Sequence, residues 1–254
     1  MAHSSVRVER APAGIGNPLP SIVSVALLTA ALGGVLAHQA HWAGAHVIAG
    51  LAAYAAVSAI IVMTVGVEPE RAGFGLANQV TLLRAGLVCL IGGALLAGGS
   101  LSLLGWSLAA LVAAALSLDA VDGWLARRYG LASAFGARFD LEIDALLILI
   151  LGVLVWQTGR VGPWVLAIGL LRYGFVLAGW LLPWLRRPLP PSRRRQAVCV
   201  QQGLTLLLCL LPPVGTNLAS VCGGVAVLAL LASFTADIIY LARVRGAPGT
   251  DRCC

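Results

Sequence analysis

Four aspartates in an otherwise apolar chain have the residue type and the spacing to do chemistry. Asp119 and Asp122 lie three residues apart, and Asp140 and Asp144 follow with a spacing of four. Ionised carboxylates at membrane depth are unfavourable unless a partner compensates them, so they indicate a functional site. Five of the chain's ten acidic residues fall between positions 119 and 144, with Glu142 as the fifth. The sequence therefore predicts that a cationic group lies among these side chains.

Each aspartate pair has a spacing that places both side chains on one face of an α-helix. The segment from Arg128 to Gly136 lets two such helices run antiparallel, with their carboxylates facing each other. Converging carboxylates offer hard oxygen ligands, which Mg²⁺ and Mn²⁺ prefer. We therefore expect one or two ions, Mg²⁺ or Mn²⁺, to be held by Asp119, Asp122, Asp140 and Asp144.

The residues beside the first aspartate pair suit a phosphate group. Gly123 and Ala126 leave the helix surface bare, so a substrate can approach closely. Arg127 supplies a cation for phosphate oxygens. A structural alternative for the four aspartates is an ion-pair network with Arg127, Arg128 and Arg138.

The composition is that of a helical membrane protein. Of the 254 residues, 59% are hydrophobic and 11% are charged, and the mean hydropathy is +0.93. In lipid every backbone polar group must be paired internally, so apolar runs of about 20 residues are expected to be helices. We expect about eight spans, at residues 21–41, 45–66, 79–98, 103–127, 139–158, 162–185, 197–213 and 217–242.

The net charge of +7 comes from arginine alone, because the sequence has no lysine. The arginines cluster in loops between apolar runs, which indicates membrane orientation rather than binding to nucleic acid. All the arginine-rich loops fall on one side of the predicted bundle, and the opposite loops contain only Arg160. Both termini and the aspartate-bearing loop are therefore expected to be cytoplasmic.

Tryptophan gives the expected depth of the aspartates. Trp106 and Trp156 mark outer ends of predicted spans, as aromatic belts do. Each lies 16 residues from an aspartate, Asp122 and Asp140 respectively. At about 1.5 Å per residue, both aspartates lie ~24 Å below the outer interface. The two pairs are therefore expected to meet just inside the cytoplasmic boundary of the bilayer.

Eight specified positions from Asp119 to Asp144 resemble the signature of the CDP-alcohol phosphotransferase family (CDP-alcohol phosphatidyltransferases), without a departure. The pattern reads Asp-x2-Asp-Gly-x2-Ala-Arg-x8-Gly-x3-Asp-x3-Asp. The segment Asn78-Gln-Val-Thr81-Leu-Leu-Arg84 is similar to the family's Asn-x2-Thr-x2-Arg motif, although Ala77 stands where a proline often precedes it. The resemblance implies an all-α membrane protein, with a six-helix catalytic core over 77–243.

The resemblance also implies a reaction and its substrates. Members of the family transfer a phosphoalcohol group from a CDP-linked donor, usually CDP-diacylglycerol, to an acceptor alcohol and release CMP. They work in the lipid bilayer, here expected to be a bacterial-type inner or plasma membrane, and make phospholipids. Many dimerise, and the Gly/Ala-rich helices would permit the close packing of a homodimer, but the sequence does not reveal the oligomeric state. Two metal ions and Asp144 as the catalytic base are implied, with a CDP site formed by Asn78, Thr81, Gly123, Ala126, Arg127 and Gly136.

The acceptor is indicated only by arginines. Arg172 lies in the middle of a predicted span, where a charge is unfavourable, and anion capture or a structural ion pair would explain it. The cluster Arg193, Arg194 and Arg195 either assists Arg172 in binding an anion or fixes the orientation of the protein in the membrane. Relatives often carry Ser-x2-Gly-Lys here, whereas Ser192 leads into three arginines. The arginines favour a phosphorylated polyol, such as glycerol 3-phosphate or an inositol phosphate.

Two alternatives stay open at the level of sequence. An intramembrane prenyltransferase also uses paired aspartates and Mg²⁺, but its usual Asp-x2-Asp-x3-Asp spacing is missing. A non-enzymatic cation transporter would use the carboxylates as an ion site, but it gains nothing from Arg127 on the ligand face.

The rest of the chain divides around the predicted core. Residues 1–20 are expected to be a cytoplasmic disordered tail, and 244–254 a second cytoplasmic tail. Residues 21–76 form a two-helix transmembrane hairpin and a linker, with a role in packing or in binding a partner. Glu142 lies off the aspartate face and is expected to pair with an arginine, and Asp237 is expected to form a structural ion pair.

Overall fold

The computed structural model describes residues 18–67, 76–129, 134–187, 189–190 and 192–246. The predicted tails, apart from residues 18–20 and 244–246, and the linker at 68–75 lie outside these ranges. Some side chains within the helices are also not described, among them those of Asp122, Ala126 and Arg127.

The described residues form helices that match the eight apolar segments of the sequence. Six of the helices are long and apolar enough to cross a membrane, judged by length and composition over the described ranges. The helices α5 and α7 do not meet that measure because they carry the charges of the site and of the arginine cluster. The α-helices are α1 (Leu19–Gln39), α2 (Gly44–Val67), α3 (Leu76–Gly93), α4 (Gly105–Tyr129), α5 (Ala134–Gln157), α6 (Ala167–Leu181), α7 (Arg193–Leu210) and α8 (Thr216–Gly246).

Two expected spans are interrupted by 3-10 helices. The span predicted at 79–98 leaves the α-helical form at Gly93 and continues as η1 (Ala94–Leu104). Glycine is a poor helix former, which accounts for a break after the pair Gly92 and Gly93. The span predicted at 162–185 is α6 flanked by η2 (Pro163–Leu166) and η3 (Pro183–Arg186). Each of these turns begins with a proline, which has no N–H to donate and so favours the start of a helical turn.

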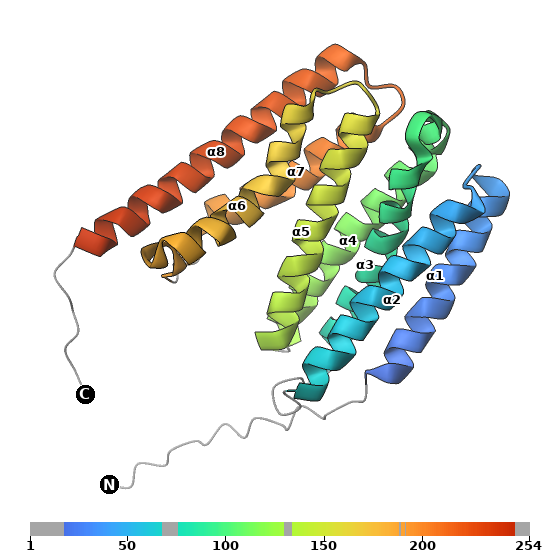
Figure 1. Cartoon of the computed structure of the whole chain (residues 1–254), viewed down its shortest axis with the longest axis horizontal. Helices are drawn as coiled ribbons and strands as arrows, with labels where there is room; N and C mark the ends of the chain where they lie inside the picture. The colour runs from blue at the N-terminus through green and yellow to red at the C-terminus, as the bar shows by residue number, and fades with distance from the viewer. Residues whose placement is uncertain (1–17, 68–75, 130–133, 188, 191, 247–254) are drawn as a thin grey trace, which may run out of the picture.

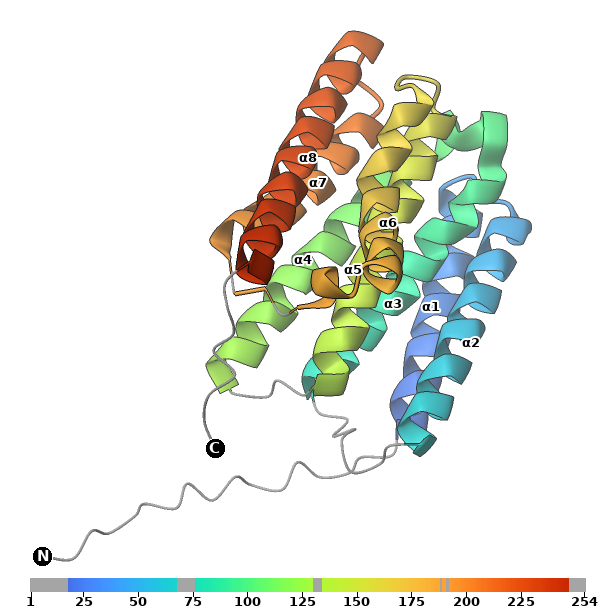
Figure 2. The same ribbon diagram turned by 60° about the vertical axis from the view of Figure 1, so that its left-hand side comes forward.

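Helices α3, α4 and α5 form the centre of the bundle (Figure 1). The hairpin of α1 and α2 packs against α3, and α6, α7 and α8 cover the other side. The helices run side by side along one general direction (Figure 2). The end of α4 and the beginning of α5 therefore lie at the same end of the bundle as the start of α1 and the end of α8. This is the end that carries the aspartates.

The N-terminal hairpin makes α3 a buried helix. Tyr54 of α2 donates a hydrogen bond to the carbonyl of Ile22 at 3.2 Å, which ties the two hairpin helices together. Trp42, which is 2% exposed, donates from Nε1 to Ser107 Oγ of α4 at 2.9 Å. Because the hairpin covers one face of α3, that helix can hold polar side chains away from both lipid and water.

Close approach between α2 and α3 depends on glycine. A Cβ added to Gly93 would lie 2.0 Å from the backbone oxygen of His46, so the two helices would have to separate. We expect Gly93→Ala to lower the free energy of unfolding by about 1–3 kcal/mol, the usual cost of overpacking. Thermal unfolding in detergent measures this. Gly34→Ala on α1 is the matched control, since a Cβ there meets no atom within 4 Å. Equal melting temperatures for the two variants would contradict the tight contact.

Candidate metal centre and substrate cavities

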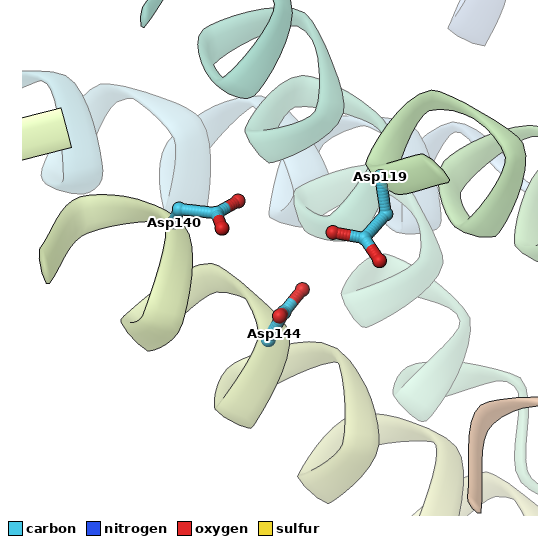
Figure 3. Close-up of side chains that lie close together, drawn as sticks. All are labelled: Asp119, Asp140 and Asp144. Atoms are coloured by element: carbon cyan, nitrogen blue, oxygen red, sulfur yellow. The ribbon is translucent and has the colours of Figure 1, made fainter. Parts of the chain in front are cut away.

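Three of the four predicted aspartates converge from two helices. Asp119 comes from α4, and Asp140 and Asp144 come from successive turns of α5, and their side chains point toward one another (Figure 3). Each offers a carboxylate oxygen, and these oxygens lie within 4.8 Å of one another. Asp122 lies on α4 one turn beyond Asp119, with its side chain outside the described part. The arrangement is a cluster of hard oxygen donors that can hold a divalent cation.

Arg84 lies in the middle of this cluster. Its side chain is fully buried, and its two terminal nitrogens form ion pairs with Asp119 and Asp140. Nη2 also lies 3.1 Å from Oδ1 of Asp144 and donates to the backbone oxygen of Asp140 at 3.3 Å. One guanidinium thus bridges three carboxylates, which retain a net negative charge. The carboxylate side chains are 26–36% exposed, so a cation can still reach them.

Sequence reasoning did not assign a role to Arg84, although it noted the motif that contains it. The signal was available, because Arg84 is a single charge inside a long apolar helix and such a charge requires a counter-ion. In the described part the arginine that pairs with Asp119, Asp140 and Asp144 is Arg84. Of the arginines in the predicted structural alternative, Arg128 and Arg138 have exposed side chains, and the side chain of Arg127 is not described.

Four of the predicted CDP-binding residues lie in the described part: Asn78, Thr81, Gly123 and Gly136. Asn78 and Thr81 are each 4% exposed and lie on α3, about two turns and one turn before Arg84 respectively. Gly136 is buried near the start of α5. Gly123 lines a cavity together with the three aspartates, while the side chains of Ala126 and Arg127 are not described.

The cavity that contains the three aspartates has a volume of about 680 Å³, and we call it the carboxylate cavity. Helices α4, α5 and α7 form its walls. Asp119, Asp140 and Asp144 supply its carboxylates, and residues such as Leu116, Leu147 and Leu204 supply apolar walls. It therefore combines anionic carboxylates with a surface that suits hydrocarbon.

A second cavity of about 500 Å³ lies among α5, α6, α7 and α8, and we call it the arginine cavity. Arg172 and Arg195 line it, together with Phe175 and Phe234. Three residues line both cavities: Asp144, Ile148 and Cys199. Asp144 is thus the carboxylate that the two cavities share.

The arginines predicted to bind the acceptor are only partly brought together. Arg172 and Arg195 line the arginine cavity, whereas Arg193 lines another cavity on α7. Arg194 pairs with Asp237 at 2.5 Å, and Arg195 lies 3.6 Å from the same carboxylate. The structural pair predicted for Asp237 is therefore confirmed.

Glu142 is also confirmed as an arginine partner. Its Oε1 accepts a hydrogen bond from Nη2 of Arg172 at 3.0 Å. The glutamate is 64% exposed and the arginine 29% exposed, so the pair is open to solvent or substrate. Surface-exposed ion pairs contribute little free energy, which leaves Arg172 available to a stronger anion.

Comparison with known proteins identifies the family to which the chain belongs. The sequence model of the CDP-alcohol phosphatidyltransferase family matches residues 74–241. Proteins named probable phosphatidylglycerophosphate synthase, from two strains of Mycobacterium tuberculosis, are 36% identical over 41% of this chain. The match spans 57% of the length of these relatives. No solved structure matches the chain. The chain is therefore an integral membrane protein that belongs to the CDP-alcohol phosphatidyltransferase family.

Proposed function

We propose that the protein transfers a phosphatidyl group from CDP-diacylglycerol to the hydroxyl of an acceptor alcohol and releases CMP. The family description implies a CDP-alcohol donor and an alcohol acceptor. The observation that carries the proposal is the position of Asp144. This carboxylate belongs to the metal-ligand cluster and also lines the cavity of the arginines. A base at this position reaches an acceptor in the arginine cavity and a donor in the carboxylate cavity.

The residues present fit divalent cations. The donor set is three carboxylates within 4.8 Å of one another, with side chains open enough for an ion to enter. We propose that Asp119, Asp122 and Asp140 hold two Mg²⁺ or Mn²⁺ ions, with Asp144 adjoining them. Bound ions would neutralise the diphosphate of the donor, polarise the phosphorus under attack and stabilise the departing CMP.

Charge balance supports two ions rather than one. Two divalent cations neutralise four carboxylates, and the guanidinium of Arg84 then leaves the site with a net positive charge. One ion would leave the site negative, which repels a diphosphate. Arg84 therefore acts in two ways: it holds the carboxylates together, and it contributes the positive charge that favours an anionic donor.

The proposed step needs one proton transfer and one exchange of bonds. Asp144 accepts the proton of the acceptor hydroxyl. The hydroxyl oxygen forms a bond to the phosphorus that carries the diacylglycerol, and the bond from that phosphorus to the bridging oxygen of the diphosphate breaks. CMP leaves with the electron pair of the broken bond. The apolar walls of the carboxylate cavity receive the lipid end of the donor.

The acceptor that the arginine cavity suits is a phosphorylated polyol. Arg172 and Arg195 present guanidinium groups, which bind phosphate oxygens in a fixed geometry. The name of the relatives, phosphatidylglycerophosphate synthase, favours glycerol 3-phosphate, and an inositol phosphate has the same chemistry. The arginine-rich end of the bundle supports a cytoplasmic location for the site and both termini.

The test is CMP release from CDP-diacylglycerol by the purified protein in detergent, with Mg²⁺ or Mn²⁺. Glycerol 3-phosphate, inositol phosphate, inositol and serine are supplied in parallel. We expect CMP only with metal and with a phosphorylated polyol, and we expect Asp140→Asn to abolish it. Glu142→Gln on the same helix is the control for removal of one carboxylate charge outside the cluster. It should still release CMP at saturating acceptor, because its partner Arg172 is proposed to act in acceptor binding. With a prenyl diphosphate supplied in place of CDP-diacylglycerol, release of pyrophosphate would instead indicate a prenyltransferase. Release of neither product from either donor would leave the cation transporter as the remaining alternative.

A further inference from the structure

Gln202 of α7 is a buried polar side chain with one half of its amide engaged. It is 3% exposed, and its Nε2 donates a hydrogen bond to the backbone oxygen of Ala226 on α8 at 2.9 Å. Only the amide nitrogen can donate to a carbonyl, so this bond fixes which way the side chain points. The Oε1 atom is buried and has no hydrogen-bond partner among the described residues. A buried acceptor without a donor is unfavourable and uncommon in folded proteins.

Gln202 is also a lining residue of the arginine cavity. The same cavity contains Arg172 and Arg195 for an anion, and Asp144 for a reacting hydroxyl. A molecule that fills this cavity and satisfies Gln202 must carry a hydrogen-bond donor besides the reacting hydroxyl. Its chemistry is therefore an anionic group, a nucleophilic hydroxyl and at least one further hydrogen-bond donor, which in a phosphorylated polyol is a second hydroxyl.

We propose that Gln202 is a specificity-determining residue, whose Oε1 accepts a hydrogen bond from a second, non-reacting hydroxyl of the acceptor. The inference rests on the proposed function and narrows its acceptor to phosphorylated polyols with two or more hydroxyls. In the free protein, water in the cavity can supply the missing donor. The hydroxyl of a matching acceptor replaces that water and keeps the bond. An acceptor without this hydroxyl fills the same space and leaves Oε1 unpaired, so the site rejects it.

The test compares an acceptor with its analogue that lacks one non-reacting hydroxyl. For glycerol 3-phosphate the analogue is 3-hydroxypropyl phosphate. We expect the wild-type protein to prefer glycerol 3-phosphate by about 10–100-fold in kcat/KM, the loss expected when one buried acceptor is left unpaired. Gln202→Met keeps the length of the side chain but removes the acceptor atom. It should lower kcat/KM for glycerol 3-phosphate by about 10–100-fold and change that for the analogue by no more than about threefold. If an inositol phosphate is the acceptor that supports CMP release, its deoxy analogues serve in the same way.

Gln201→Met is the matched control, because the neighbouring glutamine lines a different cavity on α7. Thermal unfolding in detergent shows whether either variant is misfolded. Equal losses with acceptor and analogue, in a variant with lowered stability, would show that Gln202 only supports α8 and would overturn this inference alone. A wild-type preference below about threefold would overturn it as well. Absence of CMP release by the wild-type protein with every acceptor would overturn the proposed function and this inference together.

Discussion

Asp144→Asn leaves a folded protein that releases CMP about 10³-fold more slowly than the wild type, within the range that a general base contributes. Asparagine has the shape of aspartate but cannot take the proton of the acceptor hydroxyl. The remaining Oδ1 can still accept from Arg84, whose Nη2 lies 3.1 Å from that atom, so the cluster keeps its geometry. Initial rates of CMP formation at saturating donor and acceptor measure the change in kcat.

A second measurement separates the role of a base from that of a metal ligand. Asp119 and Asp140 stay in place in this variant, so Mg²⁺ should still raise its melting temperature in detergent. In Asp140→Asn, by contrast, this Mg²⁺ response should be lost together with activity. If Asp144→Asn retains more than a tenth of the wild-type kcat, another group takes the proton. If it loses the Mg²⁺ response, Asp144 acts through the metal instead.

The positions of the helices were predictable from the sequence. Apolar runs of about 20 residues must pair their backbone groups internally in lipid, which leaves little choice but a helix. The predicted limits of α8, 217–242, lie within a few residues of the observed Thr216–Gly246. Predicted limits failed at Gly93 and at Pro163 and Pro183, where glycine or proline changes the helix type without ending the apolar run.

The convergence of the aspartates was predictable for the same reason. Spacings of three and four place carboxylates on one helix face, and a short connection brings two such faces together. The contact between Arg84 and Asp140 spans 56 positions and depends on which face α3 turns toward α5. Helical periodicity describes the faces of one helix and does not give the rotation of its neighbours. The same limit applies to Gln202, whose unpaired oxygen depends on a bond to α8.

Arg84→Met should make the stability of the protein depend on divalent metal. Without the guanidinium, Asp119, Asp140 and Asp144 face one another with no cation between them in metal-free buffer. Removing one partner of a buried charge pair costs about 3–5 kcal/mol, and partial exposure of these carboxylates reduces this to about 2–3 kcal/mol. For a chain of this length the melting temperature in EDTA should fall by about 5–10 °C. Adding Mg²⁺ should raise the melting temperature of the variant more than that of the wild type, because the ion replaces a missing charge.

Arg84→Lys separates charge from geometry. An ammonium group retains the positive charge but has no planar fork with which to bridge three carboxylates, so its stability in EDTA should lie between those of the wild type and Arg84→Met. CMP release should fall at least about tenfold in both variants even with Mg²⁺, since the carboxylates are no longer held in one arrangement for the diphosphate. A melting temperature of Arg84→Met in EDTA equal to that of the wild type would show that α4 and α5 hold the carboxylates together without α3. The hairpin, by burying α3, would then contribute only to the fold. If the stability of Arg84→Met instead depends on divalent metal, the hairpin also supports the chemistry of the site, because it buries the helix that carries Arg84.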